Sequence, residues 1–562
     1  MSNKVNNNWV VADFETKTEK FYLENGYTEV WLYAISNKKG EIINYGFTID
    51  DFFKYCREHL KGYIVYFHNL KFDGSFMLNW IIENKYPYKE KIFSKDTRCY
   101  NTLISEEGQF YQITLHFKAG ITVKFQDSLK ILPFPVAVIA KSFNLPMLKG
   151  CIDYDDYTID DEKLEYVFND VKIVALALQE IKENGMVNMT TASCAYNNFT
   201  STFPFTNSFF PVLDEKFLIE YRQAYRGGRS QVNPIYENVI CHDVKRYDVN
   251  SMYPYIMHDM ELPYGKPIKC SKMGQYKFEL YKINVTFKLK EGHLPTLLKK
   301  NVMFGDGSYY VNSEVMECLY ISNIDFEILK RHYDIEFLYV QEIWGFRTTT
   351  SIFKRYIDKW YAIKNTTTGG KRIIAKLMLN SLYGKFGSNC KGKSKIPYIN
   401  EEGILSFKNT DEQDMRKYYL PMAIAIVSYA HLILDNAIVA TGVENFVYCD
   451  TDSVHTLGTL PEDMIDNTIL GKFKLEGVEV TSKYVRQKTY VYTELNKVTN
   501  DIEYNITCAG MDAKTKSIAL ERYGDEIFKY FQRGFTIDNC KFMPKQVKGG
   551  IILVKTSFQI RN

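Results

Sequence analysis

The stretch Tyr448-Cys449-Asp450-Thr451-Asp452-Ser453 carries two carboxylates one residue apart, directly after the apolar run Phe446-Val447-Tyr448. In an extended strand, side chains alternate between faces, so Asp450 and Asp452 are expected to project the same way. Like charges held this close repel each other unless a cation lies between them, which favours a divalent metal site. The alternative is a β-turn, because Asp, Thr and Ser are common turn formers.

A second acidic element, Tyr247-Asp248-Val249-Asn250-Ser251-Met252-Tyr253-Pro254, follows the basic, glycine-bearing run Tyr225-Arg226-Gly227-Gly228-Arg229. We expect Asp248 to end a strand, and Pro254 to block the helix hydrogen bonding that would otherwise begin there. Asp248 is then placed to share a metal ion with Asp452. Its alternative role is that of a helix N-cap.

Between these acidic elements, the stretch from Gly370 to Phe386 has helical periodicity, with one polar stripe and one apolar face. The polar stripe consists of Arg372, Lys376, Asn380 and Tyr383, and the apolar face of Ile373, Ile374, Leu377 and Leu382. We expect the stripe to bind phosphates through its two cations and a base or sugar through Asn380 and Tyr383, with Lys364 adding a phosphate contact. A solvated surface helix is the alternative, because charge runs usually mark exposed faces.

The N-terminal third carries its own carboxylates. Asp13 and Glu15 follow the strand-like Trp9-Val10-Val11-Ala12, and Asp73 lies after the strand-like Tyr63-Ile64-Val65-Tyr66-Phe67. A predicted helix from Asp161 to Ile181 places Tyr166 and Asp170 on one face. Four carboxylates from two strands and a helix are suited to hold two divalent ions that hydrolyse a phosphodiester, with Tyr166 orienting the attacking water. Asp73-Gly74 is also a frequent turn signal, and any one of these acids taken singly is more often an ordinary surface or capping residue.

Three further segments have polar or aromatic groups suited to nucleic acid. The segment from Asp127 to Pro135 is predicted to be a loop with exposed apolar and aromatic groups on which bases stack, with rigid packing as the alternative. In Arg486-Gln487-Lys488-Thr489-Tyr490, Lys488 and Tyr490 are expected on one strand face, which suits a sugar-phosphate backbone and equally describes any half-exposed strand. The lysine-bearing segment from Cys508 to Asn562 is suited to clamp a duplex.

Composition bounds the class of protein. A chain of 562 residues with 46% hydrophobic residues is expected to form several packed domains or subdomains. The formal net charge of +3 creates no strong overall field, so any phosphate-binding surface must be local.

Eleven scattered cysteines without a Cys-x-x-Cys pair indicate reduced thiols rather than a zinc ribbon or disulfide framework. The first residues lack the apolar core of a signal peptide, and the apolar region from Pro421 to Gly442 carries polar side chains that disfavour a membrane span. We therefore expect a soluble intracellular protein.

Taken in order, these elements resemble the motifs of the family B DNA polymerases. Three exonuclease motifs are matched by Asp13-Phe14-Glu15, Asn69-Leu70-Lys71-Phe72-Asp73 and Tyr166-Val167-Phe168-Asn169-Asp170. Three polymerase motifs are matched by the segments 248–254, 376–384 and 448–453. The runs Tyr225-Arg226-Gly227-Gly228, Leu148-Lys149-Gly150 and Lys488-Thr489-Tyr490 resemble signatures of the protein-primed polymerases of small tailed bacteriophages, the phi-twenty-nine type. The resemblance covers nearly the whole chain.

The resemblance implies roles for individual residues. At the polymerase site, Asp248, the Val249 backbone and Asp452 are the metal ligands and Asp450 supports them. Tyr253 lies under the sugar of the incoming dNTP and excludes a 2′-hydroxyl. The other residues that bind the dNTP are Val249, Lys364, Arg372, Lys376, Asn380 and Tyr383. At the exonuclease site, Asp13, Glu15, Asp73 and Asp170 hold the metal, and Lys149 steadies the scissile phosphate. The DNA-binding residues implied in this way are Thr16, Asn69, Phe72, Ser128, Leu129, Phe134, Tyr225, Arg226, Gly227, Gly228, Lys488 and Tyr490.

The resemblance also implies an architecture and partners. It predicts a mixed α/β and α+β multidomain chain with an RNase H-like 3′-5′ exonuclease domain and a right-hand polymerase carrying two terminal-protein-region insertions. The expected order is exonuclease 1–190, palm 191–260, first insertion 261–350, fingers 351–387, second insertion 388–420, palm 421–519 and thumb 520–562. The second insertion is expected to form a polar β-hairpin that closes a ring around the template and forces strand separation.

The implied cofactors are two Mg²⁺ ions in each active site, with Mn²⁺ as a substitute. The implied partners are template and primer DNA, dNTPs, a terminal protein that primes through a hydroxyl, and a phage single-strand-binding protein. The chain is expected to be a monomer that pairs with terminal protein at initiation, without a membrane partner, in the cytoplasm of an infected bacterium.

One departure from the family pattern is plain. The subgroup usually has a template-binding Thr-x-x-Ala/Gly-Arg after the second insertion, where this chain has Val427-Ser428-Tyr429-Ala430-His431. A neutral histidine and a valine do not replace the phosphate-binding fork of arginine, so this template contact is not carried over.

Two other hypotheses are a dedicated exonuclease and a non-catalytic replication scaffold. The retention of Asp248, Lys376 and Asp452 disfavours the first. The presence of all seven metal-site carboxylates disfavours the second.

Overall fold

The N-terminal part of the chain forms a seven-stranded mixed sheet in this computed structural model, which describes residues 8–93, 95–299 and 308–561. The strand order is β3-β2-β1-β4-β7-β6-β5, and the central pairs β1–β4 and β4–β7 are parallel. The strands are β1 (Trp9–Thr16), β2 (Val30–Asn37), β3 (Ile42–Gly46), β4 (Ile64–Phe67), β5 (Cys99–Ile104), β6 (Phe110–His116) and β7 (Thr122–Asp127).

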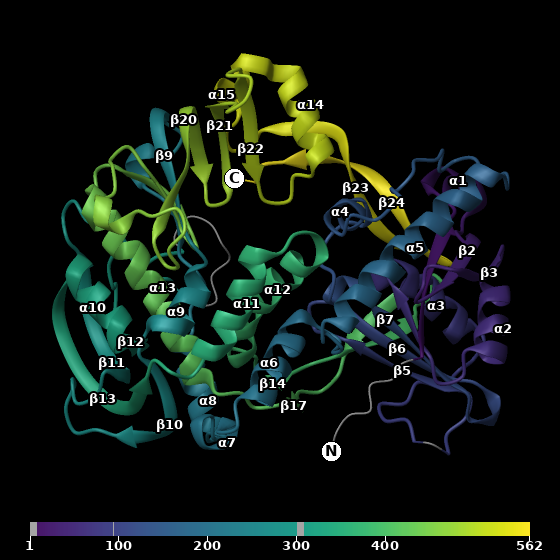
Figure 1. Cartoon of the computed structure of the whole chain (residues 1–562), viewed down its shortest axis with the longest axis horizontal. Helices are drawn as coiled ribbons and strands as arrows, with labels where there is room; N and C mark the ends of the chain where they lie inside the picture. The colour runs from purple at the N-terminus through teal and green to yellow at the C-terminus, as the bar shows by residue number, and fades with distance from the viewer. Residues whose placement is uncertain (1–7, 94, 300–307, 562) are drawn as a thin grey trace.

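Helices cover both faces of this sheet (Figure 1). The long helix α5 (Asp161–Glu183) packs on β1 and β2, and α3 (Leu70–Glu83) packs on β4, β6 and β7. The smaller helices are α1 (Glu19–Asn25), α2 (Ile49–His59) and α4 (Val136–Ser142). Apolar residues on alternate positions of β1 face opposite sides, so Val11 joins the core under α5 whereas Val10 and Ala12 join the core under α3.

A second seven-stranded sheet has the order β22-β21-β20-β9-β19-β18-β8, and its neighbouring strands are antiparallel. This order brings strands from distant parts of the chain side by side. The strands are β8 (Ser230–Val232), β9 (Ile240–Val249), β18 (Phe446–Asp450), β19 (Ser453–Thr456), β20 (Phe473–Arg486), β21 (Thr489–Leu495) and β22 (Ile502–Cys508). Helices α9 (Met252–Asp259) and α13 (Leu420–Thr441) pack beside it.

Helix α13 is long and apolar enough to cross a membrane, but 67% of its most apolar window is buried inside the fold. Apolar side chains around most of the helix therefore pack against the rest of the protein, as in a core helix. Its polar residue Asp435 is fully buried and ion-paired with Arg229 and Arg331.

Two helices lie between the two large sheets (Figure 1). They are α11 (Lys354–Thr366) and α12 (Gly369–Phe386), which pack on each other, and α12 also contacts α5 and α6 (Thr191–Thr202). The short helices α7 (Thr206–Phe209) and α8 (Glu215–Tyr221) follow α6 and lead to the second sheet. One continuous apolar core therefore joins α5 of the N-terminal unit to α12 and α13.

Residues between α9 and α11 form a separate four-stranded antiparallel sheet of order β10-β13-β11-β12, covered by α10 (Asn323–His332). Its strands are β10 (Leu262–Lys269), β11 (Phe278–Leu289), β12 (Glu317–Ser322) and β13 (Tyr333–Thr349). This unit has its own apolar core.

After α12 the chain forms the predicted hairpin, built from β15 (Lys395–Ile399) and β16 (Leu405–Asn409) and flanked by the short pair β14 (Lys391–Gly392) and β17 (Gln413–Asp414). The C-terminal unit contains α14 (Ala513–Tyr523), α15 (Ile527–Tyr530), β23 (Thr536–Val547) and β24 (Gly550–Gln559).

The β23–β24 hairpin reaches across to the N-terminal unit, where the Thr28 amide donates to the Lys548 carbonyl (Figure 1). The tip of the β15–β16 hairpin meets the same place, since Ile404 and Lys548 form a β-bridge.

Candidate active sites

The acidic hexapeptide is a tight turn rather than one continuous strand. Asp450 ends β18, Ser453 begins β19, and these two residues pair across the hairpin. Thr451 lies in the turn with φ +60°, and the Asp452 amide donates to the Asp450 carbonyl at 2.6 Å. The expectation of two aspartates on one strand face is therefore wrong. Asp and Thr stabilise the turn, and the same turn presents the two carboxylates.

Asp248 lies beside this turn because β9 and β19 are neighbours. Asp248 pairs with Ser453, and the Val249 amide donates to the Asp452 carbonyl at 2.9 Å. Burial and the charge of Asp452 raise the pKa of Asp248 to about 7. Burial also raises the pKa of Asp452. These two carboxylates thus form a pair whose repulsion a divalent cation relieves.

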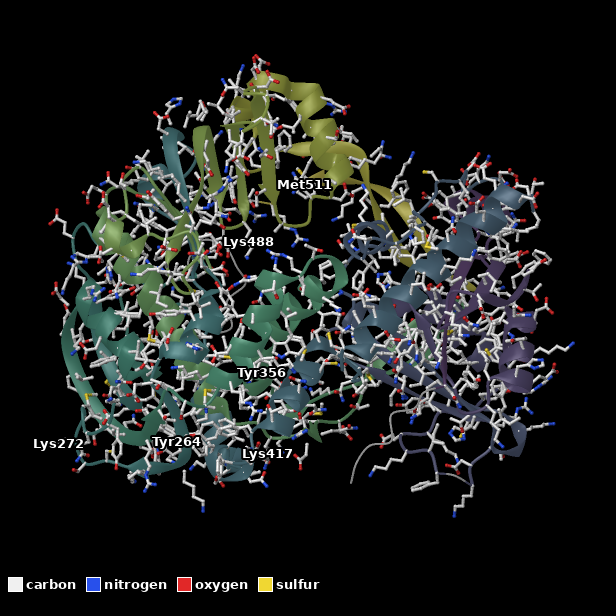
Figure 2. All side chains as sticks on the ribbon, in the orientation of Figure 1. Tyr264, Lys272, Tyr356, Lys417, Lys488 and Met511 are labelled. Carbon is white, nitrogen blue, oxygen red and sulfur yellow. The ribbon has the colours of Figure 1, made fainter. Side chains whose placement is uncertain are left out.

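Asp450 has different surroundings. Its carboxylate accepts hydrogen bonds from the Lys488 ammonium at 2.9 and 3.0 Å and from the Tyr448 hydroxyl at 3.2 Å. Lys488 lies in the turn between β20 and β21 with φ +55°, and Figure 2 shows it on the side of these strands that faces α11 and α12. Lys488 and Tyr490 therefore do not share a strand face, and Tyr490 packs against Tyr448 and Tyr484 instead.

Helix α9 begins at Met252, and Pro254 lies inside its first turn, where a missing amide proton breaks no helical hydrogen bond. The expected block at Pro254 is thus wrong, and the N-cap residue is Ser251 rather than Asp248. The Ser251 hydroxyl accepts a hydrogen bond from Lys364 at 2.8 Å, and Tyr253 stacks on Tyr383 with ring centroids 4.0 Å apart.

The polar stripe on α12 is present as predicted. Arg372, Lys376 and Asn380 are exposed, and Tyr383 is half-buried. The buried face differs in detail, because Ile374 and Leu382 are buried whereas Ile373 and Leu377 are only partly covered. Burial and the neighbouring cations Arg372 and Lys376 lower the pKa of Lys364. The stripe and Lys364 thus form a cationic surface beside Asp248, suited to a polyanion.

The N-terminal carboxylates come from one strand and two helices, not from two strands and a helix. Asp13 and Glu15 lie on β1, Asp170 lies on α5, and Asp73 lies in the first turn of α3 rather than in a turn or strand. Burial and the charge of Asp170 raise the pKa of Asp13 to about 7, and burial and the charge of Asp13 raise the pKa values of Glu15 and Asp73. The structure thus brings all four acids together.

Lys149 and Tyr166 border this cluster. Lys149 donates to Asp170 and lies 4.8 Å from the centroid of the Tyr166 ring. The Tyr166 hydroxyl is within 2.9 Å of the Tyr154 hydroxyl, a partner that the sequence did not suggest. Asp170 keeps one buried oxygen, Oδ1, without a hydrogen-bond partner. Such an orphaned oxygen among repelling acids fits a cation ligand.

The predicted single-strand contacts lie on or next to β1 and α3, which carry three of these acids, or in the 128–134 segment that His68 contacts. Thr16 ends β1, Asn69 is exposed at the start of α3, and Phe72 and Phe134 are half-buried. Leu129 is half-buried, but Ser128 is fully buried, and its hydroxyl donates to the Phe67 carbonyl. The Asp127–Pro135 segment is thus less exposed than expected, since Ile131 and Leu132 are also buried.

Sequence reasoning missed His68, which lines the cavity formed by Asp13, Lys149 and Asp170. Its ring nitrogens lie 2.9 Å from the Ser128 hydroxyl and 2.8 Å from the Phe134 carbonyl. His68 therefore links the loop that carries Ser128 and Phe134 to the carboxylate cluster. Its position directly before Asn69 was the available signal.

Within the described part of the chain, no group of three or more His, Cys, Asp or Glu side chains is arranged to enclose a metal ion. The acids are nevertheless of the type that hard divalent cations prefer.

The loop of residues 225–229 lies against the acidic turn. The Arg229 carbonyl accepts from the Thr451 amide at 2.8 Å, and a Cβ on Gly228 would lie 3.0 Å from the Thr451 hydroxyl. Arg226 is buried, and its Nε donates to the Leu298 carbonyl at 3.3 Å. Tyr225 packs so closely on Gly387 that no side chain fits there. The loop thus touches the turn, the residue after α12 and the β10–β13 unit.

Comparisons with known proteins agree with this arrangement. The family model described as DNA polymerase type B, organellar and viral, matches residues 56–158 and 155–469. The DNA polymerase of Bacillus phage Nf is 37% identical over 98% of this chain and 99% of its own length. The DNA polymerases of Bacillus phage phi29 and Streptococcus phage Cp-1 are 36% and 33% identical, each over 98% of both chains. The solved structure of phi29 DNA polymerase with primer-template DNA and incoming nucleotides matches with a TM-score of 0.89 and 35% identity, over 98% of this chain and 100% of that one.

Proposed function

This chain belongs to the protein-primed family B DNA polymerases of the phi29 type, and we propose that it couples processive, strand-displacing synthesis to 3′-5′ proofreading. It is a DNA polymerase with the mixed α/β multidomain fold of phi29 DNA polymerase. The observation that carries the proposal is the presence of two separate sets of buried or partly buried carboxylates, one on each seven-stranded sheet with its helices.

The set formed by Asp248 and Asp452 is the site of synthesis. Lys376, Arg372 and Lys364 bind the triphosphate. Burial and the two neighbouring cations lower the pKa of Lys364, and the negative charge of the triphosphate relieves the repulsion among the three. Asn380 and Tyr383 contact the new base pair, and the Tyr253 ring stacked on Tyr383 lies under the sugar. Asp450 positions the turn, and Lys488 and Tyr490 hold the primer strand from β21 and the turn before it.

The set formed by Asp13, Glu15, Asp73 and Asp170 is the proofreading site. Lys149 steadies the scissile phosphate and Tyr166 orients the water that attacks it. A frayed primer end is bound by Thr16, Asn69, Phe72, Ser128, Leu129 and Phe134. The contacts of His68 support this assignment. His68 lies within hydrogen-bond distance of Ser128 and Phe134 and lines the same cavity as Asp13 and Asp170.

Family B polymerases use divalent metal ions, and both acid sets fit Mg²⁺, with Mn²⁺ as a substitute. Asp248, Asp452 and the Val249 backbone would hold the ions for synthesis, and the four N-terminal acids would hold those for hydrolysis. A bound cation lowers the pKa of the attacking oxygen and offsets the negative charge that develops on the phosphate.

The domain assignment follows the elements. We assign residues 1–190 to the exonuclease, 191–260 and 421 onward to the palm, 261–350 and 388–420 to the two insertions, and 351–387 to the fingers. Residue 520 lies inside α14, so we place the start of the thumb before Ala513 instead. The apolar core of the C-terminal unit also includes Val485, Val491 and Ile506 of the second sheet, so the two parts pack directly on each other.

The bridge between Ile404 of the second insertion and Lys548 of the thumb supports a closed ring around DNA. A ring that surrounds the template keeps the enzyme bound and separates the strand ahead of it. The relatives from Bacillus phages Nf and phi29 and from Streptococcus phage Cp-1 are DNA polymerases, which supports initiation on a terminal protein, cooperation with a phage single-strand-binding protein and action as a monomer in the cytoplasm of an infected bacterium.

The test is extension of a primed single-stranded circle with Mg²⁺ and dNTPs, without helicase or clamp. Products many times longer than the circle are expected. Synthesis that stops after one circuit would contradict strand displacement, and a primer that is never shortened when dNTPs are withheld would contradict proofreading.

A further inference from the structure

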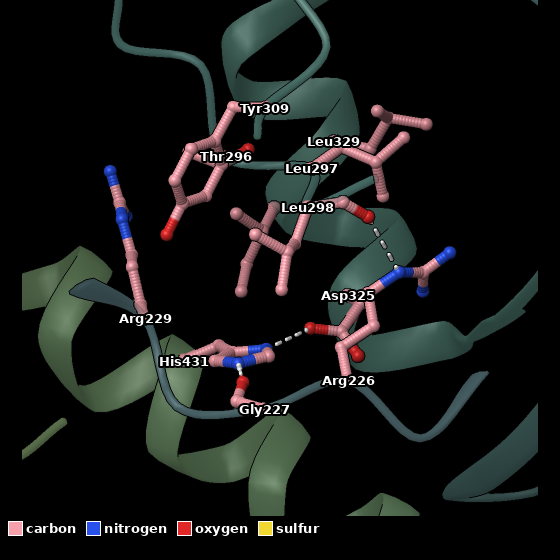
Figure 3. Close-up of a pocket in the computed structure, with 11 residues that line it drawn as sticks. Arg226, Gly227, Arg229, Thr296, Leu297, Leu298, Tyr309, Asp325, Leu329 and His431 are labelled. Carbon is pink, nitrogen blue, oxygen red and sulfur yellow. Dashed lines mark hydrogen bonds and ion pairs between the residues drawn. The ribbon is translucent and has the colours of Figure 1, made fainter. Parts of the chain in front are cut away.

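Residue His431 lies where the family resemblance leads us to expect a template-binding arginine, and in this chain it connects α13 to two other parts of the protein. Its Nδ1 is 2.8 Å from Oδ1 of Asp325 on α10, and its Nε2 is 2.8 Å from the Gly227 carbonyl (Figure 3). His431 itself lies on α13. One side chain thus joins α13, the first insertion and the 225–229 loop.

The hydrogen bonds identify the protonation state of His431. The Gly227 carbonyl can only accept, so Nε2 must carry a proton. The ionised carboxylate of Asp325 can also only accept, and its other oxygen receives hydrogen bonds from the hydroxyls of Ser322 and Ser428. An imidazole that donates from both nitrogens is an imidazolium, so His431 is a cation here and not the neutral ring assumed from the sequence.

The surroundings of Asp325 stabilise its negative charge. Burial would raise its pKa, but the pairing with His431 and the hydrogen bond from Ser428 outweigh burial and hold the pKa below its usual value. Among the described residues that line this cavity, Asp325 is the one carboxylate. The other charged or titratable groups that face it are Arg226 and Arg229 on the loop and Tyr309 from the first insertion.

The two arginines do not replace His431. Arg229 is bound to Asp435, one turn further along α13, and to the Gln231 side chain. Arg226 donates to the Leu298 carbonyl, and its Nη1 is buried without a hydrogen-bond partner. The Gly227 carbonyl therefore receives its hydrogen bond from His431, which Asp325 holds in place.

The position of Gly227 matters because its neighbour Gly228 lies against Thr451, between the two aspartates of the catalytic turn. Loss of the His431 proton would set a nitrogen lone pair against either the Asp325 carboxylate or the Gly227 carbonyl. Both contacts are repulsive, so the loop and α10 would separate.

We propose that protonated His431 is a positioning residue that fixes the 225–229 loop to the first insertion, so that the grip of this polymerase on primer-template DNA weakens as His431 loses its proton. The inference rests on the proposed polymerase function and on the DNA-binding role that the family resemblance implies for this loop. It adds a proton-dependent latch in which His431 makes two contacts, one to Asp325 and one to Gly227.

The experiment measures the dissociation constant for a fluorescent primer-template duplex by anisotropy, without divalent ions, across the range in which imidazoles titrate, about pH 5 to 8. The unsubstituted protein is expected to bind roughly tenfold more weakly at the upper end, the factor that corresponds to the loss of one charged hydrogen bond. His431→Arg, which stays cationic, should bind tightly and lose this pH dependence. His431→Asn and Asp325→Asn should bind weakly throughout.

The matched control is His242→Gln, which removes an exposed histidine on β9 and should keep the full pH dependence. If His431→Arg retains the pH dependence, or His431→Asn binds as tightly as the unsubstituted protein at every pH, the latch is refuted. Should His431→Asn fail to fold, as thermal unfolding would reveal, the profile of His431→Arg still decides. A complete lack of duplex binding by the unsubstituted protein would instead contradict the proposed function.

Discussion

Lys488 donates hydrogen bonds to both carboxylate oxygens of Asp450, across 38 residues of sequence. This pairing distinguishes the two aspartates of the acidic turn. The charge of Asp450 is balanced by an ammonium group, whereas burial and the proximity of Asp450 raise the pKa of Asp452. Asp452 is thus the acid of the turn whose charge calls for a metal ion, and Asp450 and Lys488 are its support.

Lys488→Met should lower nucleotide incorporation about tenfold, because the unbalanced charge of Asp450 then acts on Asp452. Single-nucleotide extension at saturating dNTP measures this change. Lys54→Met, which removes an exposed lysine from α2, should leave the rate unchanged. Equal rates for Lys488→Met and the unsubstituted protein would show that Lys488 does not support synthesis.

Asp13→Ala combined with Asp73→Ala should abolish digestion of a 3′ overhang while primer extension continues, because these acids belong to the N-terminal set alone. Gel analysis of a labelled primer with and without dNTPs separates the two activities. A double variant that still shortens the primer would show that hydrolysis occurs elsewhere.

Asp13→Asn should raise the unfolding temperature in EDTA at neutral pH. The pKa of Asp13 is about 7 in the folded protein, against 3.8 for an unperturbed aspartate, so the folded state binds more protons between these values. The free energy of unfolding therefore falls as the pH rises between these two values, and the substitution removes this pH dependence. Calorimetry should show that the unfolding temperatures of the two proteins approach each other toward the acidic end of this pH range. A constant difference would mean that ionisation of Asp13 is not the cause.

Gly549→Val should shorten the products made on a primed circle without slowing addition of a single nucleotide. Gly549 has φ +86°, and a Cβ there would lie 2.2 Å from the Thr28 carbonyl oxygen, so the thumb hairpin would leave the N-terminal unit. Gly510→Val is the matched control, because Gly510 has φ +84° but open space around its Cβ position. If both variants make equally long products, this contact is not part of a ring.

The sequence predicted the elements whose signal is local. The stripe on α12 and the helix that carries Tyr166 and Asp170 follow from helical spacing, and both are present. The fold class also followed, but from the resemblance of the ordered motifs rather than from periodicity.

Contacts between distant residues could not be predicted. The pairing of Lys488 with Asp450 and of His431 with Asp325 depends on strand order and on the placement of an insertion, which no local pattern encodes. Asp450 and Asp452 show a further limit. The sequence pattern indicates either a turn or a metal site, whereas the backbone forms a turn that also presents the acids.

The central claim is that synthesis and degradation depend on separate carboxylate sets, and Asp452→Ala tests it most directly. A 5′-labelled primer on its template is incubated with Mg²⁺, with and without dNTPs, and its length is followed with time. Incorporation should fall roughly a thousandfold or more, since a shared metal ligand is lost, while shortening of the primer continues at the rate of the unsubstituted protein. Undiminished extension, or loss of both activities in a folded variant, would contradict the account.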